Sequence, residues 1–511
     1  MFIPSLREVQ DLAARYSFIP VKLTLLADKE TPIRLYQKFR SVHSFLLESV
    51  EGGARWARYS FIGLRPFLIL EAKGTQIRLT HRNGTVEQRA GNPLQVLKEV
   101  TARYRSPKLP QMPRLCGGAV GYFGYNTLQY CEKIPSHARE PLDMADLRFL
   151  LVDEVIAFDH WKQEIQLVVN MEIQAEDDEG TIAEKYAKAC DRLLQIADQA
   201  LAEPPESEHP RQIPIAREPH RELYVKANME PDEYERMVER AKAYIAAGDI
   251  FQVVLSQRFE VETAVDPFSV YRVLRTLNPS PYMYYLQFEK ETIVGASPEL
   301  QVRVEDGRVE MRPIAGTRRR GGDAAEDEAL ARDLLADPKE RAEHTMLLDL
   351  GRNDIGRVAA YGSVKVEEQM IIERYSHVMH MVSHVSGTLR DGLHPLDALL
   401  STFPAGTVSG APKLRAMEII AELERDARHT YAGAIGYLSF TGDLDTCITI
   451  RTLLFADGKA HIQAGAGIVA DSVPRHEHQE CINKAAAMIK ALAKAEQLFP
   501  REEEKPCCLK P

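Results

Sequence analysis

The chain has 511 residues, of which 27% are charged and 45% hydrophobic, and its formal net charge at pH 7 is −10. This composition is typical of a globular protein that builds more than one layer or subdomain. An acidic balance without a basic stripe argues against a nucleic-acid partner, and no apolar run approaches the roughly 20 residues of a membrane span. Seven scattered cysteines and a start without signal-peptide features predict a cytoplasmic protein.

Residues 1–202 form a first region in which strand and helix patterns mix. Thr75–Leu79 alternates between polar and apolar side chains, and Asn83-Gly84 after it predicts a hairpin turn. Gly117–Gly124 is rich in glycine and aromatic residues, but its glycine spacing is not that of a dinucleotide-binding loop. We therefore expect a packed turn there, and a helix over Ala187–Ala202.

A Pro-rich polar stretch, residues 203–221, predicts a linker between this region and a second one. Residues 222–495 open with a helix, because Pro231 suits a first helical turn and Gly248 suits a helix end. Residues 496–511 have the composition of a disordered tail. Long strands with segregated helices favour an α+β fold over a doubly wound one.

Two helical segments carry glutamates at spacings that place them on one helix face. Glu340 and Glu343 are three residues apart, and Glu477, Glu480 and Lys484 share a face of the second segment. Two helices that direct carboxylates to one point would form a site for a hard cation such as Mg²⁺. Each group taken alone more often belongs to a solvated helix face.

Other segments are suited to an anionic ligand. The loop Phe403–Lys413, which contains Thr407, precedes a helix whose N-terminus suits a carboxylate or phosphate. Gly465–Gly467 would let a ligand approach the backbone, although a tight turn between strand and helix fits equally well. Arg451 at a strand end is a natural partner for a carboxylate, and Tyr431 opens another strand.

Together these segments resemble the chorismate-utilising enzymes, and within them the anthranilate synthase component I family. The motifs that carry the resemblance occur in the family order: Ile250–Ser256, Gly295–Glu299, Pro313–Thr317, Glu343–Asp354, the Thr407 loop and Gly465–Gly467. The resemblance implies two β-sheets packed face to face with helices outside. It also implies a Mg²⁺-dependent carbon–oxygen lyase that makes anthranilate and pyruvate from chorismate and ammonia, the first committed step of tryptophan biosynthesis.

The resemblance also assigns roles around the metal and the substrate. By position, Glu343 and Glu480 correspond to direct metal ligands that hold the ring carboxylate through Mg²⁺, with Glu340 and Glu477 in support. The implied substrate-binding residues are Gln252, Ala315, Gly316, Thr317, Tyr431, Arg451, Gly465, Ala466, Gly467 and Lys484.

Loss of the ring hydroxyl of chorismate requires a proton donor. Glu299 and His380 match the family's residues on that side of the substrate, and Thr407 matches a catalytic-site position. Either Glu299 or the Glu299–His380 pair would be the general acid, and the choice stays open. A lone histidine beside an apolar strand is more often structural than catalytic.

Two positions separate this chain from its nearest relatives. Isochorismate and salicylate synthases resemble it but carry a water-activating lysine where Gln252 stands, and aminodeoxychorismate synthases carry a lysine where Ala315 stands. Both differences favour anthranilate synthase. The alternatives are an aminodeoxychorismate synthase component I and a catalytically silent subunit that binds tryptophan.

The resemblance finally implies regulation and a partner. A tryptophan feedback pocket would be formed by Leu47, Glu48, Ser49, Pro281, Tyr282 and Met283. An apolar pocket with a hydroxyl and a carboxylate could hold an indole and an ammonium group. The chain has no glutaminase half, so use of glutamine implies a separate glutamine amidotransferase subunit, anthranilate synthase component II, in a heterotetramer.

Overall fold

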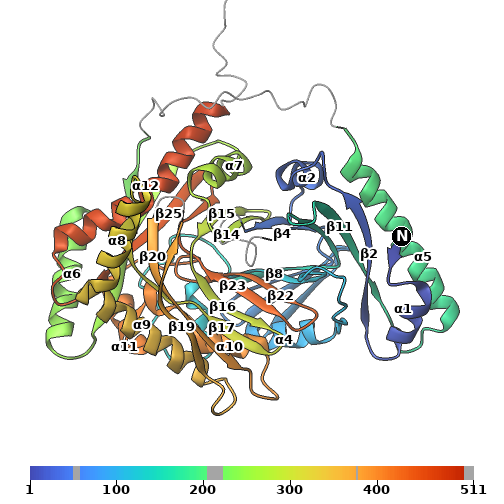
Figure 1. The fold of residues 1–511 in the computed structure, drawn as a ribbon, viewed down its shortest axis with the longest axis horizontal. Coiled ribbons are helices and arrows are strands. Elements are labelled where there is room, and N and C mark those ends of the chain that lie inside the picture. The colour runs from blue at the N-terminus through green and yellow to red at the C-terminus, as the bar shows by residue number, and fades with distance from the viewer. Residues whose placement is uncertain (50–57, 204–222, 376–377, 500–511) are drawn as a thin grey trace, which may run out of the picture.

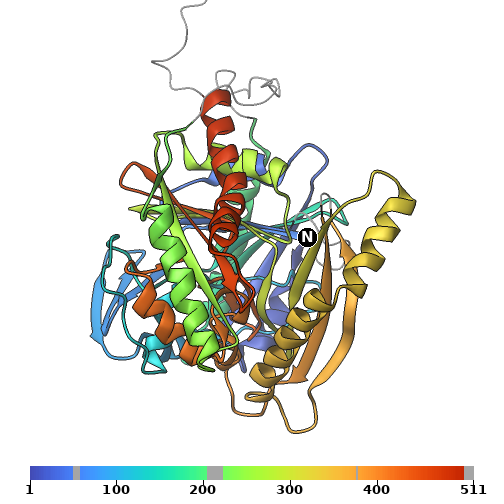
Figure 2. The same cartoon turned by 90° about the vertical axis from the view of Figure 1, so that its left-hand side faces the viewer.

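The computed structural model describes residues 1–49, 58–203, 223–375 and 378–499. Within these ranges the strands form two antiparallel sheets, with helices around them (Figure 1). Figure 2, turned by 90°, shows α12 (red) running down the middle of the view, with α8 and α9 (gold) to its right. The expected linker beyond residue 203 and the tail beyond residue 499 lie outside the described residues.

The larger sheet has the order β1 (Phe2–Ile3), β2 (Phe18–Leu26), β11 (Glu164–Glu172), β10 (Glu154–Asp159), β4 (Tyr59–Leu64), β3 (Ser44–Glu48), β14 (Tyr282–Gln287), β15 (Glu291–Ser297), β24 (Thr452–Ala456), β25 (Lys459–Ile468), β13 (Gln252–Glu262) and β12 (Lys226–Ala227), with β21 (Gly410–Ala411) paired to β13. The second sheet has the order β18 (Ile314–Arg319), β20 (Val378–Thr388), β17 (Arg308–Met311), β16 (Leu300–Glu305), β23 (Leu444–Ile448), β22 (Ala434–Ser439), β8 (Gly118–Phe123), β9 (Leu147–Val152), β5 (Leu68–Lys73), β6 (Gln76–His81) and β7 (Val86–Ala90), with β19 (Lys365–Arg374) paired to β20.

The helices are α1 (Leu6–Ala13), α2 (Pro32–Phe39), α4 (Pro93–Ala102), α5 (Glu179–Leu201), α6 (Pro231–Ala246), α7 (Pro267–Leu277), α8 (Ala324–Ala336), α9 (Pro338–Gly356), α10 (Pro395–Thr402), α11 (Lys413–Leu423) and α12 (Pro474–Leu498), with short 3₁₀ turns η1 (Tyr125–Tyr130) and η3 (Gly406–Val408). The α+β prediction is confirmed. Helix α12 continues to Leu498, past the boundary at which the tail was expected to begin.

Both sequence regions contribute strands to both sheets. In the larger sheet β3 of the first region pairs with β14 of the second, so that Glu48 lies opposite Met283. In the second sheet β8 pairs with β22, which belongs to the second region. The two regions predicted from the sequence therefore share one framework, and the linker joins segments that are interleaved in space.

Local sequence signals explain several elements. Helix α6 begins at Pro231, buries Tyr234, Met237, Val238 and Ala241 along one stripe, and is followed by Gly248 with a φ of 84°. The Asn83-Gly84 turn joins β6 to β7 as predicted. The packed turn expected at Gly117–Gly124 is wrong, because this segment contains strand β8. A Cβ on Gly121 would lie 1.9 Å from the Arg148 carbonyl oxygen, so glycine lets the adjacent strand approach closely.

A buried ion pair, between Arg428 and Glu424, joins strand β13 to the loop that contains Thr407. Arg428 is fully buried and its Nη2 lies 2.6 Å from the Glu424 carboxylate. The same guanidinium donates to the carbonyl oxygens of Val408 and Val254, each at 2.7 Å, and Glu424 accepts from the Ser256 amide. The pair thereby links the Thr407 loop to β13.

Replacing Arg428 by alanine is expected to lower the free energy of unfolding by about 3–5 kcal/mol, because the buried Glu424 carboxylate loses its partner. Urea titration followed by circular dichroism would measure the change. Arg415→Ala is the matched control, since its ion pairs with Asp249 and Glu418 lie at the surface and contribute about 0–1 kcal/mol. Equal losses in the two variants would contradict the structural role of Arg428.

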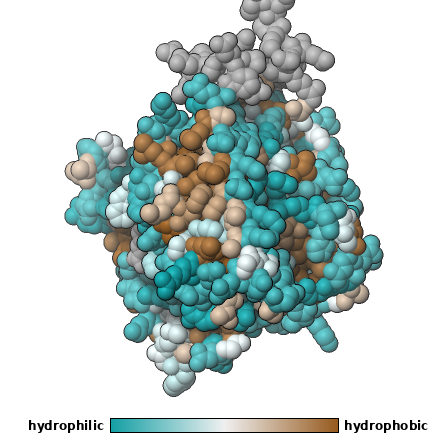
Figure 3. Space-filling view, turned by 90° about the vertical axis from the view of Figure 1, so that its right-hand side faces the viewer, coloured by the Kyte–Doolittle hydropathy of each residue, from teal (hydrophilic) through white to brown (hydrophobic). Residues whose placement is uncertain are grey.

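One face of the molecule combines hydrophilic surface with a hydrophobic area. Figure 3 shows the side of the molecule that carries α5 and α1, where teal surface surrounds a hydrophobic area. Exposed apolar side chains in this part of the chain include Leu26, Trp161, Leu194 and Leu201. Among the described residues, no helix combines the length and the apolar character needed to cross a bilayer.

Candidate active site

Helices α9 and α12 bring the four predicted glutamates near one another. Burial raises the pKa of Glu343, and the neighbouring carboxylates of Glu340 and Glu480 raise it further. The pKa of Glu477 is likewise raised, first by burial and then by Glu480. The carboxylates are close enough to repel one another. Carboxylate oxygens are also the ligands that a hard cation such as Mg²⁺ prefers.

These carboxylates do not yet converge as a coordination shell. Within the described ranges, no group of three or more His, Cys, Asp or Glu side chains is arranged to hold a metal ion. Two of the four carboxylates are engaged by cations of the chain itself: Lys484 Nζ lies 2.7 Å from Glu480, and Arg318 Nη1 lies 3.1 Å from Glu340. For Glu343 and Glu480 to converge on a metal, Lys484 would have to leave Glu480, while Glu340 can stay paired with Arg318.

The glycine segment Gly465–Gly467 lies within strand β25, so the alternative of a tight turn is wrong. A Cβ on Gly465 would lie 2.6 Å from the Tyr431 hydroxyl, and one on Gly467 would lie 2.6 Å from Gln252 Nε2. Small residues here make room for these two polar side chains. Ala466, between the glycines, is fully buried.

A group of cationic and phenolic side chains adjoins β25. Lys484 donates to the Gly465 carbonyl oxygen at 2.9 Å. Arg451 has a φ of 52°, and burial lowers the pKa of its guanidinium while Tyr431 and Glu480 oppose that shift. Tyr431 lies in a turn before β22 and does not begin that strand. The arrangement offers charge and hydrogen-bond donors to a carboxylate.

Strands β18 and β20 position Gly316, Thr317 and His380. The pairing has an irregularity between Ala315 and Thr317, where Gly316 takes a φ of 72°. His380 Nδ1 lies 3.1 Å from the Gly316 carbonyl oxygen and 3.0 Å from Thr317 Oγ1. A carbonyl oxygen only accepts, so Nδ1 carries the proton. Because burial lowers the pKa of His380, the ring is neutral near pH 7 and Nε2 is an acceptor.

Glu299 lies between β15 and β16 with its backbone fixed on both sides. Its amide donates to Ser297 Oγ at 3.4 Å, and its carbonyl oxygen accepts from the Ile448 amide at 3.0 Å. Burial raises the pKa of its carboxyl group to about 8, although Thr407 and Lys484 lower it. Thr407 and Lys484 lie near enough to influence this carboxyl group, and Lys484 also pairs with Glu480, so Glu299 lies near the glutamate cluster. Within the part of the chain that the structure describes, the side chains of Glu299 and His380 form no hydrogen bond or ion pair with each other.

The six residues predicted for the feedback pocket line one cavity at the ends of β3 and β14. Leu47, Glu48 and Ser49 contribute from one strand, and Pro281, Tyr282 and Met283 from the other. The Glu48 carboxylate already accepts hydrogen bonds from Tyr271 and Arg275. A ligand ammonium would therefore share this carboxylate with an arginine.

Sequence reasoning missed several residues of this cavity. Its lining also includes Arg58, Arg114, Tyr437 and Asp445. Asp445 accepts from the Tyr282 hydroxyl at 3.0 Å and from Arg303 Nε at 3.0 Å. These residues come from strands and loops far apart in the chain, and no local motif identifies them.

The chain is similar to known proteins over nearly its whole length. A family model described as chorismate binding enzyme matches residues 52–490. The anthranilate synthase component 1 of Acetivibrio thermocellus is 50% identical over 499 residues, which cover 98% of this chain and 100% of that protein. That of Pseudomonas aeruginosa is 46% identical over 488 residues, covering 94% and 97%.

Solved structures give the same result. The crystal structure of anthranilate synthase component I from Streptococcus pneumoniae has a TM-score of 0.74 and 38% identity, and the match covers 91% of this chain and 99% of that one. The menaquinone-specific isochorismate synthase of Escherichia coli shares the fold, with a TM-score of 0.67 at 18% identity over 95% and 98% of the chains. The chain therefore belongs to the chorismate binding enzyme family, in the group of its anthranilate synthase component 1 members.

Proposed function

We propose that this chain makes anthranilate and pyruvate from chorismate and ammonia, as the first committed step of tryptophan biosynthesis. Two buried side chains support ammonia as the nucleophile. Gln252 is 5% exposed and Ala315 is 8% exposed, and neither can attack the substrate or activate water as the lysines of related enzymes do. The nitrogen must therefore come from outside the chain.

The proposal rests on Glu299, whose backbone is held by Ser297 and Ile448 and whose buried surroundings raise the pKa of its carboxyl group. With a pKa of about 8, this carboxyl group is largely protonated at neutral pH and can donate to the leaving C4 hydroxyl, which departs as water. His380 is the weaker candidate for this role, because its neutral ring offers an acceptor at Nε2. We assign Glu299 as the general acid and His380, held by Gly316, as a residue that orients the substrate.

Magnesium is part of the proposal. Glu343 and Glu480 would hold the ion, with Glu340 and Glu477 in support, and the mutual repulsion that raises the pKa of Glu343 favours a cation there. When bound, Mg²⁺ would neutralise the ring carboxylate of chorismate and hold it in place. Lys484 would then be released from Glu480 to face the substrate.

The remaining assignments concern the second carboxylate of chorismate, on the enolpyruvyl group. We assign Arg451 and Tyr431 to it, together with the backbone of Gly465 and Gly467. Thr317 and Thr407 line the same site beside His380 and Glu299 respectively. Arg451 supplies the bidentate donor pair that planar carboxylates prefer.

The proposal includes a partner and a regulator. The relatives are named component 1, which supports a second component, a glutamine amidotransferase that supplies ammonia within a heterotetramer. Tryptophan would bind in the cavity between β3 and β14 and favour a less active conformation. A cytoplasmic location is part of the proposal, and the described cysteines, which form no disulfides, are compatible with it.

The direct test is to mix the purified chain with chorismate, Mg²⁺ and ammonium chloride at about pH 8 and to follow anthranilate fluorescence. A signal that tryptophan suppresses would support the reaction, the nitrogen source and the regulation together. Chorismate consumption without anthranilate would point to aminodeoxychorismate or isochorismate as the product. Absence of consumption with and without the amidotransferase would favour a silent subunit.

Ser49→Ala is expected to weaken tryptophan inhibition by about tenfold or more, because the hydroxyl at the end of β3 lines the cavity. Inhibition curves at fixed chorismate would measure the effect, with activity in the absence of tryptophan as the internal control. Ser41→Ala is a matched control, since Ser41 lies in the turn before β3 and is not among the cavity residues. Unchanged inhibition in Ser49→Ala would remove Ser49 from the inhibitor site.

A further inference from the structure

Arg318 connects three elements at the edge of the candidate active site. It lies on β18, directly after Thr317, and its guanidinium contacts three carboxylates on two helices. Nε lies 2.8 Å from Asp333 of α8, Nη2 lies 2.8 Å from Asp337, and Nη1 lies 3.1 Å from Glu340 of α9. A planar guanidinium can hold several carboxylates in a fixed geometry, which a lysine ammonium cannot.

Asp337 makes this contact structurally important. Its Oδ1 caps α9 by accepting from the amides of Lys339 and Glu340, at 2.9 and 3.2 Å, while Oδ2 accepts from Arg318. Arg318 therefore fixes the residue at which α9 begins. Because Glu340 and Glu343 lie in the first two turns of that helix, the position of its N-terminus sets where their carboxylates lie.

The carboxylate of Glu340 also lies close to the backbone of β18. A Cβ on Gly316 would lie 3.0 Å from Glu340 Oε2, so the absence of a side chain at Gly316 lets this carboxylate approach the strand. Glu340 Oε1 accepts from Arg318, two residues further along β18. The carboxylate is therefore held against β18 by one glycine and one arginine.

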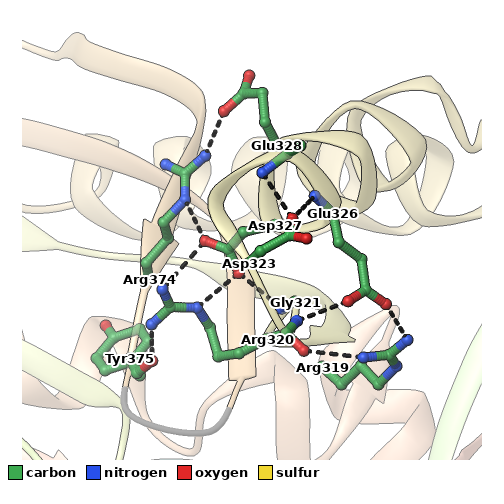
Figure 4. A network of polar contacts seen from close by, with 11 residues as sticks. Arg319, Arg320, Gly321, Asp323, Glu326, Asp327, Glu328, Arg374 and Tyr375 are labelled. Carbon is green, nitrogen blue, oxygen red and sulfur yellow. Dashed lines mark hydrogen bonds and ion pairs between the residues drawn. The ribbon is translucent and has the colours of Figure 1, made fainter.

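The other end of α8 is fastened to the same sheet by a separate set of ion pairs. Figure 4 shows Arg320 and Arg374 converging on Asp327, and Arg319 reaching Glu326. These contacts involve the first turns of α8 and no residue of α9. Arg318 alone among these arginines reaches a member of the glutamate cluster.

We propose that Arg318 is a positioning residue of the magnesium site, which acts through Asp337 and Glu340 to hold the start of α9 in the geometry that accepts the ion. The inference rests on the proposed function, because it assumes that the glutamate cluster binds Mg²⁺. It goes beyond that function by assigning the support of the cluster to a residue that would contact neither the ion nor the substrate.

The experiment measures metal affinity directly, by titrating Mn²⁺ into the full-length protein with chorismate present and recording free Mn²⁺ by electron paramagnetic resonance. Arg318→Ala is expected to weaken affinity by about 10–100-fold, the usual effect of removing an outer-shell partner. Arg318→Lys should recover only part of the loss. Arg319→Ala is the matched control, because Arg319 lies on the same strand and its ion pair is with Glu326 of α8, outside the glutamate cluster.

A double-mutant cycle tests whether Arg318 acts through Glu340. In a Glu340→Gln background, Arg318→Ala should have a clearly smaller effect than in the wild type, since coupled residues are not additive. Circular dichroism verifies folding, and if Arg318→Ala does not fold, Arg318→Lys and Arg318→Gln take its place. Affinities of Arg318→Ala and Arg319→Ala that agree within twofold would overturn the inference. Failure of the wild type to bind Mn²⁺ or Mg²⁺ would instead overturn the metal site on which it rests.

Discussion

Replacing Glu299 by glutamine is expected to lower kcat by about 10²–10⁴-fold, the usual contribution of a general acid, with a much smaller change in KM for chorismate. Glutamine keeps the size and polarity of the side chain but cannot transfer a proton to the leaving hydroxyl. The backbone contacts of Glu299 with Ser297 and Ile448 remain, so the fold should be preserved. Anthranilate formation from ammonium chloride would measure both constants.

The pH dependence separates Glu299 from other candidates. Its pKa is raised to about 8, so the acid is present below that pH and is lost above it. At a constant concentration of free ammonia, the wild-type rate should be level below pH 8 and fall above it by about tenfold per pH unit. Glu299→Gln should lack this fall.

His380→Gln provides the comparison for the same role. Because the His380 ring is neutral and donates from Nδ1 to Gly316, its loss is expected to affect substrate orientation more than proton transfer. A larger kcat loss in His380→Gln than in Glu299→Gln, or a wild-type profile that persists in Glu299→Gln, would contradict the assignment of Glu299 as the acid.

Helix spacing made the glutamate pairs predictable, because residues three apart share a face whatever the fold around them. The sequence could not show that α9 and α12 bring Glu343 near Glu480, since that depends on two sheets whose strands come from both regions of the chain. Nor could it show that Arg318 holds Glu340, although helix spacing did place Lys484 on the face of Glu480. Arg318 follows Thr317 in a run of three arginines, and nothing in the run distinguishes it from Arg319.

Glycine-rich segments were the least predictable from sequence. Gly117–Gly124 and Gly465–Gly467 both suggest turns, yet the first contains β8 and the second lies in β25. In each case the reason for glycine is a neighbour distant in sequence: the Arg148 carbonyl oxygen beside Gly121, and Gln252 Nε2 beside Gly467. The local sequence does not distinguish a glycine that lies in a strand from one that lies in a turn.

The cavity at the ends of β3 and β14 shows the same division between local and distant information. Its six predicted residues come from two short motifs that β3 and β14 place side by side through strand pairing. Tyr437 and Asp445 join them only because the second sheet packs against the first, whereas Arg58 directly precedes β4, which pairs with β3. The family resemblance predicted six lining residues, Glu48 among them, while the other charged lining residues follow from tertiary packing.

Replacing Glu343 or Glu480 by glutamine is expected to remove Mg²⁺-dependent turnover, with a loss of about 10³-fold or more, since a metal that binds substrate contributes several kcal/mol to the reaction. Both variants should fold. Asp349→Asn on α9 is the matched control, because Asp349 forms one exposed ion pair with Arg352 and lies outside the cluster. Near-normal activity in both glutamate variants would contradict the metal assignment.

Glu343→Gln is also expected to raise the melting temperature of the metal-free protein, whereas replacement of a residue that only supports the fold would lower it. The pKa of Glu343 is raised in the folded state by burial and by Glu340 and Glu480, so its contribution to stability is present at low pH and is lost as pH rises through the folded pKa. At pH 7 or above, glutamine removes this repulsion, and the metal-free variant should melt at a higher temperature than the wild type.

Mg²⁺ should raise the wild-type melting temperature and leave that of the variant unchanged, because only a protein that binds the ion gains stability from it. Differential scanning fluorimetry with and without Mg²⁺ measures both effects, and equal stabilisation of the two proteins by Mg²⁺ would place the ion elsewhere.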